Sequence, residues 1–479
     1  MAFLPTRVFE FNAADITFGS KEVTNHKVLG RQSKNRSFAY GGALYQIVHD
    51  NVGQTDPANY LDPDYQREVW HAQKSTDEGA TWTELDHAGY PVGGLSFEVS
   101  GRGDAVARVG DVLWLFFTYG EEIAPGYATR FDRIHAVSFD LATEQWGSII
   151  TSGGPYYGIT ANTDKGHLVF DACYRGSNEI IVYHNDSDYT VSPKRAMYSI
   201  FNSSSQTWTS IDNVVFTSST ATHITPCSCA FDGTYVHFTA MAGAYFSAGV
   251  SYKPHRTLDS GNTLGTVSDM LSAYPGGLRP KNTSTIGWVD SLVVHGGEVF
   301  CAQIYYGYSR YGAPYFRQKI LVMRAPTGVA NPSWTVEDVE STAWESIYDA
   351  DDGWSDSPAF VESGGDLYLI HPGRMLGFFG YTPDVAQYFL FTQKYGGSGV
   401  WAAPVQFWSF HENYPGSGAF DLDDIFNLSA IGDLSGTAEV GIGITGGWKS
   451  YGAHAFPYDN TVFWFRSGQV SCCCADFAY

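Results

Sequence analysis

The sequence has few charged residues, no long apolar run and no regular cysteine spacing, and each absence excludes a class of protein. Charged residues make up only 16% of the 479 residues. No run of about 18 apolar residues occurs, so we expect no membrane-spanning helix. The first residues, MAFLPTRVFEF, lack an apolar core followed by a small-residue cleavage site, so we expect no signal peptide.

Disulfide and metal frameworks are also missing. The seven cysteines are irregularly spaced, and neither Cys227-Ser228-Cys229 nor the run Cys472-Cys473-Cys474 matches zinc or redox motifs. We therefore expect reduced, mostly buried thiols and assembly in a reducing compartment.

Basic side chains are scarce, with 28 Lys and Arg against 50 Asp and Glu and a net charge of −22. Nucleic-acid binding depends on basic patches that displace counterions, so we expect no sequence-specific nucleic-acid partner. The first 36 residues differ, because six basic residues face only three acidic ones there. A basic arm on an acidic body suits assembly, although an ordinary solvated chain end has the same composition.

What the sequence does contain is one unit repeated seven times. Each copy has a short strand of small residues, a glycine turn and a strongly apolar second strand, as in Ser37–Tyr40, Gly41-Gly42 and ALYQIVHD. From Gly42 the turn glycines advance by 68, 66, 57, 64, 68 and 71 residues, and no helical pattern interrupts them. A third strand follows, and then a fourth that begins at one marker position. The markers are Trp82, Trp146, Trp208, Leu264, Trp334 and Trp401.

Four short strands per unit, repeated at this period, predict an all-β fold with a single β-propeller. We expect seven four-stranded blades, with six as the alternative. The propeller should occupy residues 33–479, after a short N-terminal arm or closing strand at residues 1–32.

Two octapeptides mark the turn before the fourth strand. Residues 75–82 read STDEGATW, and residues 257–264 read TLDSGNTL with Leu in place of Trp. An Asp there can cap the amides of its turn, a Gly can take a positive φ, and a Trp can pack on the neighbouring sheet. The motif resembles the Asp-box, or BNR repeat, of sialidase-type β-propellers. This resemblance implies a structural role for Ser75, Asp77, Gly79, Trp82, Asp259 and Gly261.

Ring closure requires a strand from one terminus beside the last blade. We expect Ile16-Thr17-Phe18 to supply it, with Gln469–Phe477 as the competitor. Val8-Phe9-Glu10-Phe11 also alternates like a strand and would then be free to dock on a neighbouring protein as an added strand.

The long loops of a propeller share one face, and here three of them, at 306–316, 371–384 and 446–459, are rich in Tyr and Gly. This composition suits adaptable protein or carbohydrate contacts, although the aromatics could equally pack the loops onto the blades. Acidic residues gather at 349–356 and 421–424 on the same face. Ca²⁺ is one candidate ligand, but position twelve of an EF-hand loop would be Phe360, so we prefer a solvated acidic loop and expect no cofactor. The ligand-binding candidates are Tyr306, Arg310, Tyr311, Asp351, Asp352, Trp354, Asp423, Trp448 and Tyr451.

The sialidase resemblance does not extend to catalysis. That family uses an arginine triad, a Tyr nucleophile with a carboxylate and an Asp acid/base. Its Arg-Ile-Pro signature is missing, and the nearest match is Asn35-Arg36-Ser37-Phe38. We therefore assign no catalytic residue, and a glycoside hydrolase acting on surface carbohydrate remains the alternative function.

A propeller with an arm and no secretion signal resembles the nozzle, hub and fibre-associated proteins of tailed-phage virions. The resemblance implies a non-enzymatic structural protein of the virion, assembled in the host cytoplasm. Its partners would be other virion proteins, further copies of itself in a ring, or a host glycan.

Overall fold

The computed structural model describes most of the strands and some of the turns between them. The described residues are 10–11, 27–28, 37–52, 67–77, 81–87, 104–121, 130–155, 169–186, 195–217, 223–243, 249–250, 253–273, 281–282, 290–308, 316–339, 358–376, 386–403, 405–411, 420–432, 440–450 and 459–466. Every element in these ranges is a β-strand. Within them, no helical segment could span a bilayer.

The described strands form seven sheets of four or five strands, one for each sequence unit. The first sheet holds β2 (Lys27–Val28), β3 (Ser37–Tyr40), β4 (Ala43–Val52), β5 (Arg67–Ser75) and β6 (Thr83–His87). The second holds β7 (Asp104–Val109), β8 (Val112–Glu121), β9 (Arg130–Asp140) and β10 (Gln145–Trp146). The third holds β11 (Val169–Gly176), β12 (Glu179–Asp186), β13 (Arg195–Asn202) and β14 (Thr207–Thr217). The fourth holds β15 (His223–Phe231), β16 (Val236–Gly243), β18 (Pro254–Leu258) and β19 (Ser268–Asp269).

The fifth sheet holds β21 (Ser291–His295), β22 (Glu298–Tyr308), β23 (Phe316–Pro326) and β24 (Thr335–Asp338). The sixth holds β25 (Ala359–Ser363), β26 (Asp366–Leu376), β27 (Ala386–Lys394) and β28 (Val405–His411). The seventh holds β29 (Phe420–Gly432), β30 (Val440–Ser450), β31 (Asp459–Arg466) and β1 (Glu10–Phe11). A separate two-stranded sheet pairs β17 (Gly249–Val250) with β20 (Lys281–Asn282).

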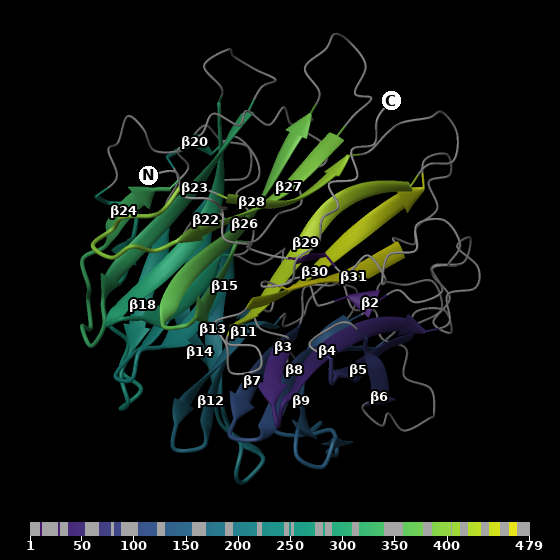
Figure 1. Cartoon of the computed structure of the whole chain (residues 1–479). Coiled ribbons are helices and arrows are strands. Elements are labelled where there is room, and N and C mark those ends of the chain that lie inside the picture. Colours follow the sequence, from purple (N-terminus) through teal and green to yellow (C-terminus); the bar gives the residue numbers. More distant parts are fainter. Residues whose placement is uncertain are drawn as a thin grey trace.

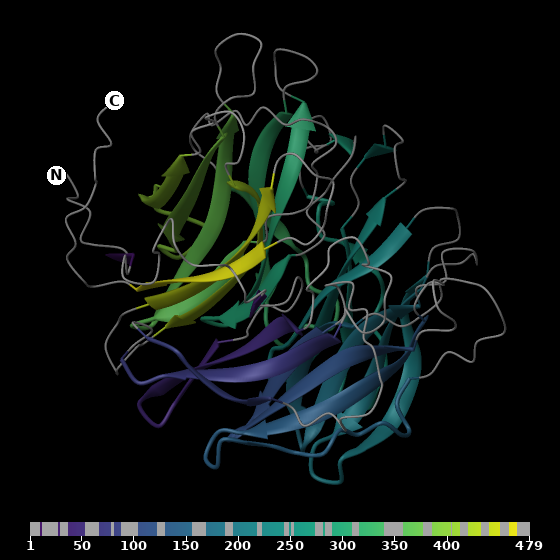
Figure 2. The same ribbon diagram turned by 90° about the vertical axis from the view of Figure 1, so that its right-hand side faces the viewer.

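The sheets stand around one axis, with the first long strand of each unit innermost. Contacts link β7 to β11, β11 to β15, β15 to β21, β21 to β25, β25 to β29 and β29 to β3. The last of these contacts returns the end of the chain to its start, and both ribbon views show the yellow seventh sheet beside the purple first one (Figures 1 and 2). The prediction of an all-β propeller with four-stranded blades is confirmed.

An N-terminal strand joins the last sheet, but it is not the one that we expected. β1 pairs antiparallel with β31, with Glu10 opposite Arg466 and Phe11 opposite Phe465. Ile16–Phe18 and Gln469–Phe477 lie outside the described residues. The prediction that Val8–Phe11 is free to dock on a neighbour is therefore wrong for Glu10 and Phe11. The error arose because strand alternation does not identify the partner of a strand.

Aromatic side chains fill the seams between neighbouring sheets. Phe201 of β13 is fully buried against Trp114 and Phe116 of β8, with ring centroids 4.9 and 5.4 Å away. Trp208, at the marker position of the third unit, lies 5.2 Å from Phe201 and 5.8 Å from Phe116. This marker Trp therefore packs on the neighbouring sheet, as the sequence predicts.

The Asp-box carboxylates cap their turns. Asp77 Oδ1 accepts hydrogen bonds from Ser75 Oγ at 2.7 Å and from the Thr81 amide at 2.8 Å, and Oδ2 accepts one from Thr81 Oγ1 at 2.5 Å. Partial burial opposes ionisation, but the hydrogen bonds from Thr81 and Ser75 lower the pKa of Asp77. In the second box, Asp259 Oδ1 accepts the Thr263 amide at 2.7 Å.

The glycine of the second box has a different role from the one that we expected. The left-handed residue is the sixth of the octapeptide, Asn262 at φ 64°, and not Gly261. The sixth position is left-handed in other units too, with Glu144 at 58° and Gln206 at 56°. A Cβ on Gly261 would lie 3.3 Å from Asp259 Oδ1. Gly261 therefore makes room for the capping carboxylate.

Asp77→Ala should lower the free energy of unfolding by about 1 kcal/mol, because the turn loses the cap of the Thr81 amide. The measurement is the urea midpoint, followed by tryptophan fluorescence. Thr76→Ala is the matched control, since Thr76 is exposed beside Asp77 in the same turn and its removal should change stability by less than about 0.5 kcal/mol. Equal midpoints for the two variants would contradict the capping role.

Candidate functional site

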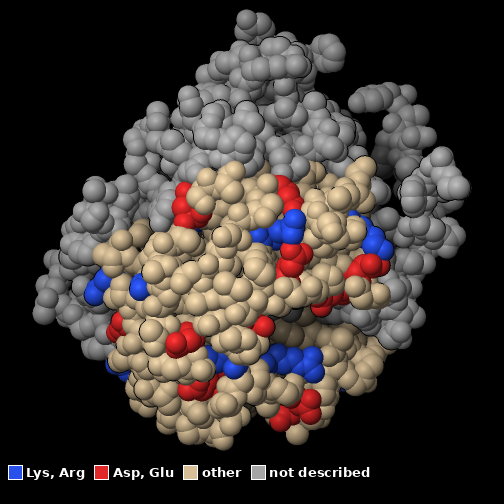
Figure 3. Space-filling model, turned by 90° about the vertical axis from the view of Figure 1, so that its left-hand side faces the viewer, with Lys and Arg blue, Asp and Glu red and all other residues tan. Residues whose placement is uncertain are grey.

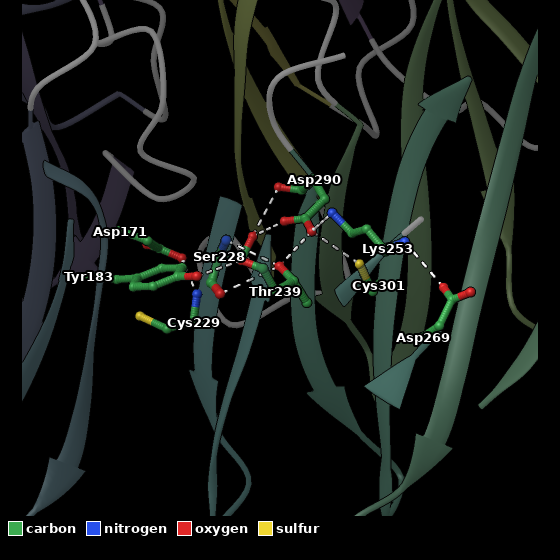
Figure 4. Close-up of polar contacts among 9 residues, drawn as sticks. All are labelled: Asp171, Tyr183, Ser228, Cys229, Thr239, Lys253, Asp269, Asp290 and Cys301. Carbon is green, nitrogen blue, oxygen red and sulfur yellow. Dashed lines mark hydrogen bonds and ion pairs between the residues drawn. The ribbon is translucent and has the colours of Figure 1, made fainter. Parts of the chain in front are cut away.

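Buried aspartates lie at the start of three inner strands, at the end of the ring where the blade-to-blade connections enter. Asp104 opens β7, Asp171 is the third residue of β11, and Asp290 directly precedes β21. All three are buried, and Asp290 has no exposed surface. Polar groups from the third, fourth and fifth sheets thus meet beside the axis (Figure 4).

Asp290 lies at the centre of this group. Lys253 Nζ, directly before β18, is 2.6 Å from Asp290 Oδ2, and Thr239 Oγ1 of β16 donates to the same oxygen at 2.6 Å. Ser228 Oγ of β15 donates to Oδ1, and Cys301 Sγ of β22 lies 3.3 Å from Oδ2. Lys253 is only 1% exposed, so the ion pair is enclosed and ties the fourth sheet to the fifth.

Asp171 ties the third sheet to the fourth. Its Oδ2 accepts the Cys229 amide of β15 at 2.9 Å, and its Oδ1 accepts the Ala172 amide at 2.9 Å. Nearby, the Tyr183 hydroxyl donates to the Thr239 carbonyl at 3.0 Å. Burial and the surrounding acidic groups raise the pKa of Tyr183 well above its usual value, so the phenol stays a donor. Amide donors favour the charged form of Asp171, which keeps 8% of its surface exposed.

The two aspartates therefore differ in what they can do chemically. Taking up a proton at Asp290 would break an enclosed ion pair, and its two oxygens are already occupied by Lys253, Ser228 and Thr239. Asp171 is held as an acceptor by two backbone amides and keeps 8% of its surface exposed.

The structure places some of the candidates that the sequence identified. Tyr306 lies in β22, and Asp423 and Trp448 lie in β29 and β30 of the seventh sheet. Leu422 pairs with Trp448 and Asp424 with Gly447, and Asp423 is the extra residue of a bulge between these two pairs. Asp423 and Trp448 are thus brought together at the end of the sheet where connections enter. The other candidates lie outside the described residues: Arg310, Tyr311, Asp351, Asp352, Trp354 and Tyr451.

The boundaries of the loops require a correction. We expected residues 421–424, 446–450 and 371–376 to lie in loops, but they belong to β29, β30 and β26. The antiparallel ladders continue through them, down to the pair Phe420 and Ser450. Tyr, Gly and acidic residues in these segments suggested loops, whereas backbone pairing extended the hairpins.

Of the Asp-box residues, Ser75, Asp77, Asp259 and Gly261 lie in or beside turns that join third strands to fourth strands, at the opposite end of the sheets. Trp82 is half-buried there, and Gly79 lies outside the described residues.

Sequence reasoning missed Asp104, Asp171, Asp290 and Lys253. A signal was present, because the three aspartates precede the turn glycines Gly110, Gly176 and Gly296 by six, five and six residues. Lys253 has no equivalent in the repeat, and only the folded ring brings it to Asp290.

No protein-family model matches the sequence, and no curated protein matches it. Among solved structures, the chain is similar to Trypanosoma rangeli sialidase in complex with the inhibitor DANA, at 11% identity and a TM-score of 0.40. That match covers 76% of this chain but only 55% of the sialidase. It is also similar to the GH93 α-L-arabinofuranosidase of Fusarium graminearum in complex with arabinobiose, at 13% identity, 96% and 97% coverage and a TM-score of 0.41. A fungal alcohol oxidase of the AA5 family matches at 12% identity, 91% and 75% coverage and a TM-score of 0.42. These likenesses concern the fold alone.

Proposed function

We propose that the protein is a carbohydrate-directed β-propeller that binds glycan at the end of the ring where the blade-to-blade connections enter. The observation that carries this proposal is the placement of Asp423 beside Trp448 at that end of the seventh sheet. These two residue types at neighbouring backbone positions suit a sugar, because an indole can cover its apolar face and a carboxylate can accept from its hydroxyls. Tyr306, toward the same end of β22, adds a second aromatic.

The aspartates beside the propeller axis favour glycan binding over glycan hydrolysis. A glycosidase needs two carboxyl groups that flank the scissile bond with room for the sugar between them. Asp290 is enclosed and neutralised by Lys253, so it is a poor member of such a pair.

The charge distribution on the side of the molecule that carries β18 does not favour a polyanionic ligand. Figure 3 shows the charged side chains of the described residues there in small mixed groups, on a mostly uncharged surface. The described residues on that side form no extended field of one sign that would attract a polyanion. A neutral glycan or a protein surface is the better partner for it.

Glycoside hydrolysis is the second candidate, and Asp171 is the observation that favours it. Asp171 accepts two backbone amides, keeps part of its surface exposed and lies toward the same end of the ring. A nucleophile or base of a glycosidase must be ionised and reachable, and amide donors such as those at Asp171 favour the ionised form.

The test is a glycan array together with a panel of aryl glycosides and sialosides, using the full chain. We expect binding without turnover, and a loss of about tenfold or more for Trp448→Ala at unchanged melting temperature. Tyr174→Ala is the matched control, because Tyr174 is 37% exposed near the glycine turn at the opposite end of β11 and should not affect binding. Turnover that Asp171→Asn abolishes would establish the second candidate. If the protein neither bound nor hydrolysed any of these compounds, both candidates would be refuted.

Three expectations stay predictions: a place in a phage virion, assembly with itself or with other virion proteins, and the absence of a cofactor. Light scattering of the purified chain tests assembly directly. A deletion of residues 1–12 would not test the arm alone, because it would also remove β1 from the seventh sheet.

A further inference from the structure

A chain of hydrogen bonds crosses the fourth sheet from an inner turn to the outer edge. His237 Nε2 of β16 lies 3.0 Å from Asp232 Oδ2, in the turn after β15. His237 Nδ1 lies 3.0 Å from His255 Nε2 of β18. His255 Nδ1 lies 3.3 Å from Ser268 Oγ of β19. The chain therefore joins a carboxylate, two imidazoles and a hydroxyl in series.

The carboxylate end of this chain is held ionised. Asp232 Oδ1 accepts the amides of Thr234 and Tyr235 at 2.7 and 2.6 Å, and Oδ2 also accepts the Gly328 amide at 2.7 Å. Burial opposes ionisation, but the hydrogen bonds from His237 and from these amides lower the pKa of Asp232. An ionised carboxylate can only accept protons, so His237 must carry a proton on Nε2.

The ionised Asp232 determines which nitrogen of each imidazole donates its hydrogen bond. With that proton on Nε2, His237 can accept at Nδ1 a hydrogen bond from His255 Nε2, 3.0 Å away. The free acceptor of His255 is then Nδ1, which faces the Ser268 hydroxyl. Every donor in the series points toward Asp232, and the terminal nitrogen is placed to take the proton of Ser268.

The two imidazoles of this hydrogen-bonded series are buried, whereas Ser268 at its end is partly exposed. The side chains of His237 and His255 are 0% and 1% exposed, and the His255 ring stands edge-on to Trp334 with centroids 4.8 Å apart. Burial lowers the pKa of His255 well below its usual value, so it is a neutral base at pH 7. Ser268 is half-buried on the outer strand and is the member that a solute can reach.

A second Ser–His pair, in the third sheet, differs from Ser268 and His255 in the exposure of its serine and in the position of its carboxylate. Ser199 Oγ lies 2.8 Å from His184 Nε2, but Ser199 has no exposed surface. Asp212 Oδ1 approaches the same nitrogen at 3.8 Å, so it does not orient the imidazole from behind. This pair shows what a closed Ser–His contact looks like in the same fold.

We propose that Ser268 is a nucleophile activated by His255, and that it takes the acyl group of small activated esters or the phosphonyl group of fluorophosphonates. Ser268 Oγ forms the new bond to carbon or phosphorus while its proton passes to His255 Nδ1. The leaving group departs with the bonding electrons, as a phenolate or as fluoride. His237 and Asp232 are positioning residues that hold the tautomer and stabilise the imidazolium.

The test is labelling of the full chain with a fluorophosphonate probe, with the modified residue identified by peptide mass spectrometry. We expect one adduct, on Ser268, that Ser268→Ala abolishes. His255→Gln should slow labelling about 100-fold or more, as expected for loss of a general base. Ser199→Ala, the matched control from the third sheet, should leave the rate unchanged.

A measurement on the unaltered protein covers the case in which a His255 variant does not fold. The labelling rate should be constant from pH 8 down past pH 6.5 and fall only in more acidic solution, because His255 must be neutral to act. Labelling no faster than that of the Ser268→Ala protein, or an adduct on another residue, would overturn the proposal.

Discussion

Asp290→Ala should lower the free energy of unfolding by about 3–5 kcal/mol, because it removes the carboxylate that neutralises the buried ammonium of Lys253. The same change takes an acceptor from the hydroxyls of Ser228 and Thr239. Urea denaturation followed by tryptophan fluorescence measures the effect. We expect the seam between the fourth and fifth sheets to be the weakened part, which hydrogen exchange of β15 and β21 would show.

Two comparisons make this result specific. Asp366 and Lys394 form an ion pair that is 41% and 46% exposed, so Asp366→Ala should cost no more than about 1 kcal/mol. Asp290→Asn combined with Lys253→Met removes both charges and should be milder than Asp290→Ala alone. If Asp290→Ala were as mild as Asp366→Ala, the axial pair would not be holding the two sheets together.

Phe201→Ala should cost about 3–5 kcal/mol, because a fully buried ring is removed from the seam between the second and third sheets. Trp114, Phe116 and Trp208 all lose an aromatic partner, and such pairs contribute about 0.5–1.5 kcal/mol each beyond their buried area. The urea midpoint and the melting temperature are the measurements.

Phe201→Leu is the conservative comparison and should cost clearly less than Phe201→Ala, because it leaves a smaller cavity. Ile211→Ala, on the outer strand of the same sheet, tests the position, since Ile211 is 46% exposed and its removal should change little. A loss below 1 kcal/mol for Phe201→Ala would mean that aromatic packing does not hold this seam.

The two sites proposed for this protein can be tested independently. Glycan binding depends on groups at the end of the ring where connections enter, and labelling depends on the outer edge of the fourth sheet. Trp448→Ala should therefore leave fluorophosphonate labelling unchanged, and Ser268→Ala should leave glycan binding unchanged.

The Asp-box shows how far turn chemistry can be predicted from sequence. The capping role of Asp77 and Asp259 followed from the octapeptide, because a carboxylate reaches only the amides of its own turn. The left-handed residue did not follow. Gln206 and Asn262 take positive φ where glycine is absent, because the strands on either side of the turn impose that conformation.

By itself the sequence determined the all-β class, the repeated four-strand unit and the packing of a Trp on the neighbouring sheet. These features depend on the alternation within a strand and on residues close together in the chain, so the pattern records them directly. Only the tertiary structure decided that β1 joins β31 and that Lys253 neutralises Asp290. It also decided that Ser268 lies at the end of a hydrogen-bonded series through two buried imidazoles. Those partners belong to different strands or to different sheets. They meet only when the ring closes, and local periodicity carries no information about which distant residues the closure will bring together.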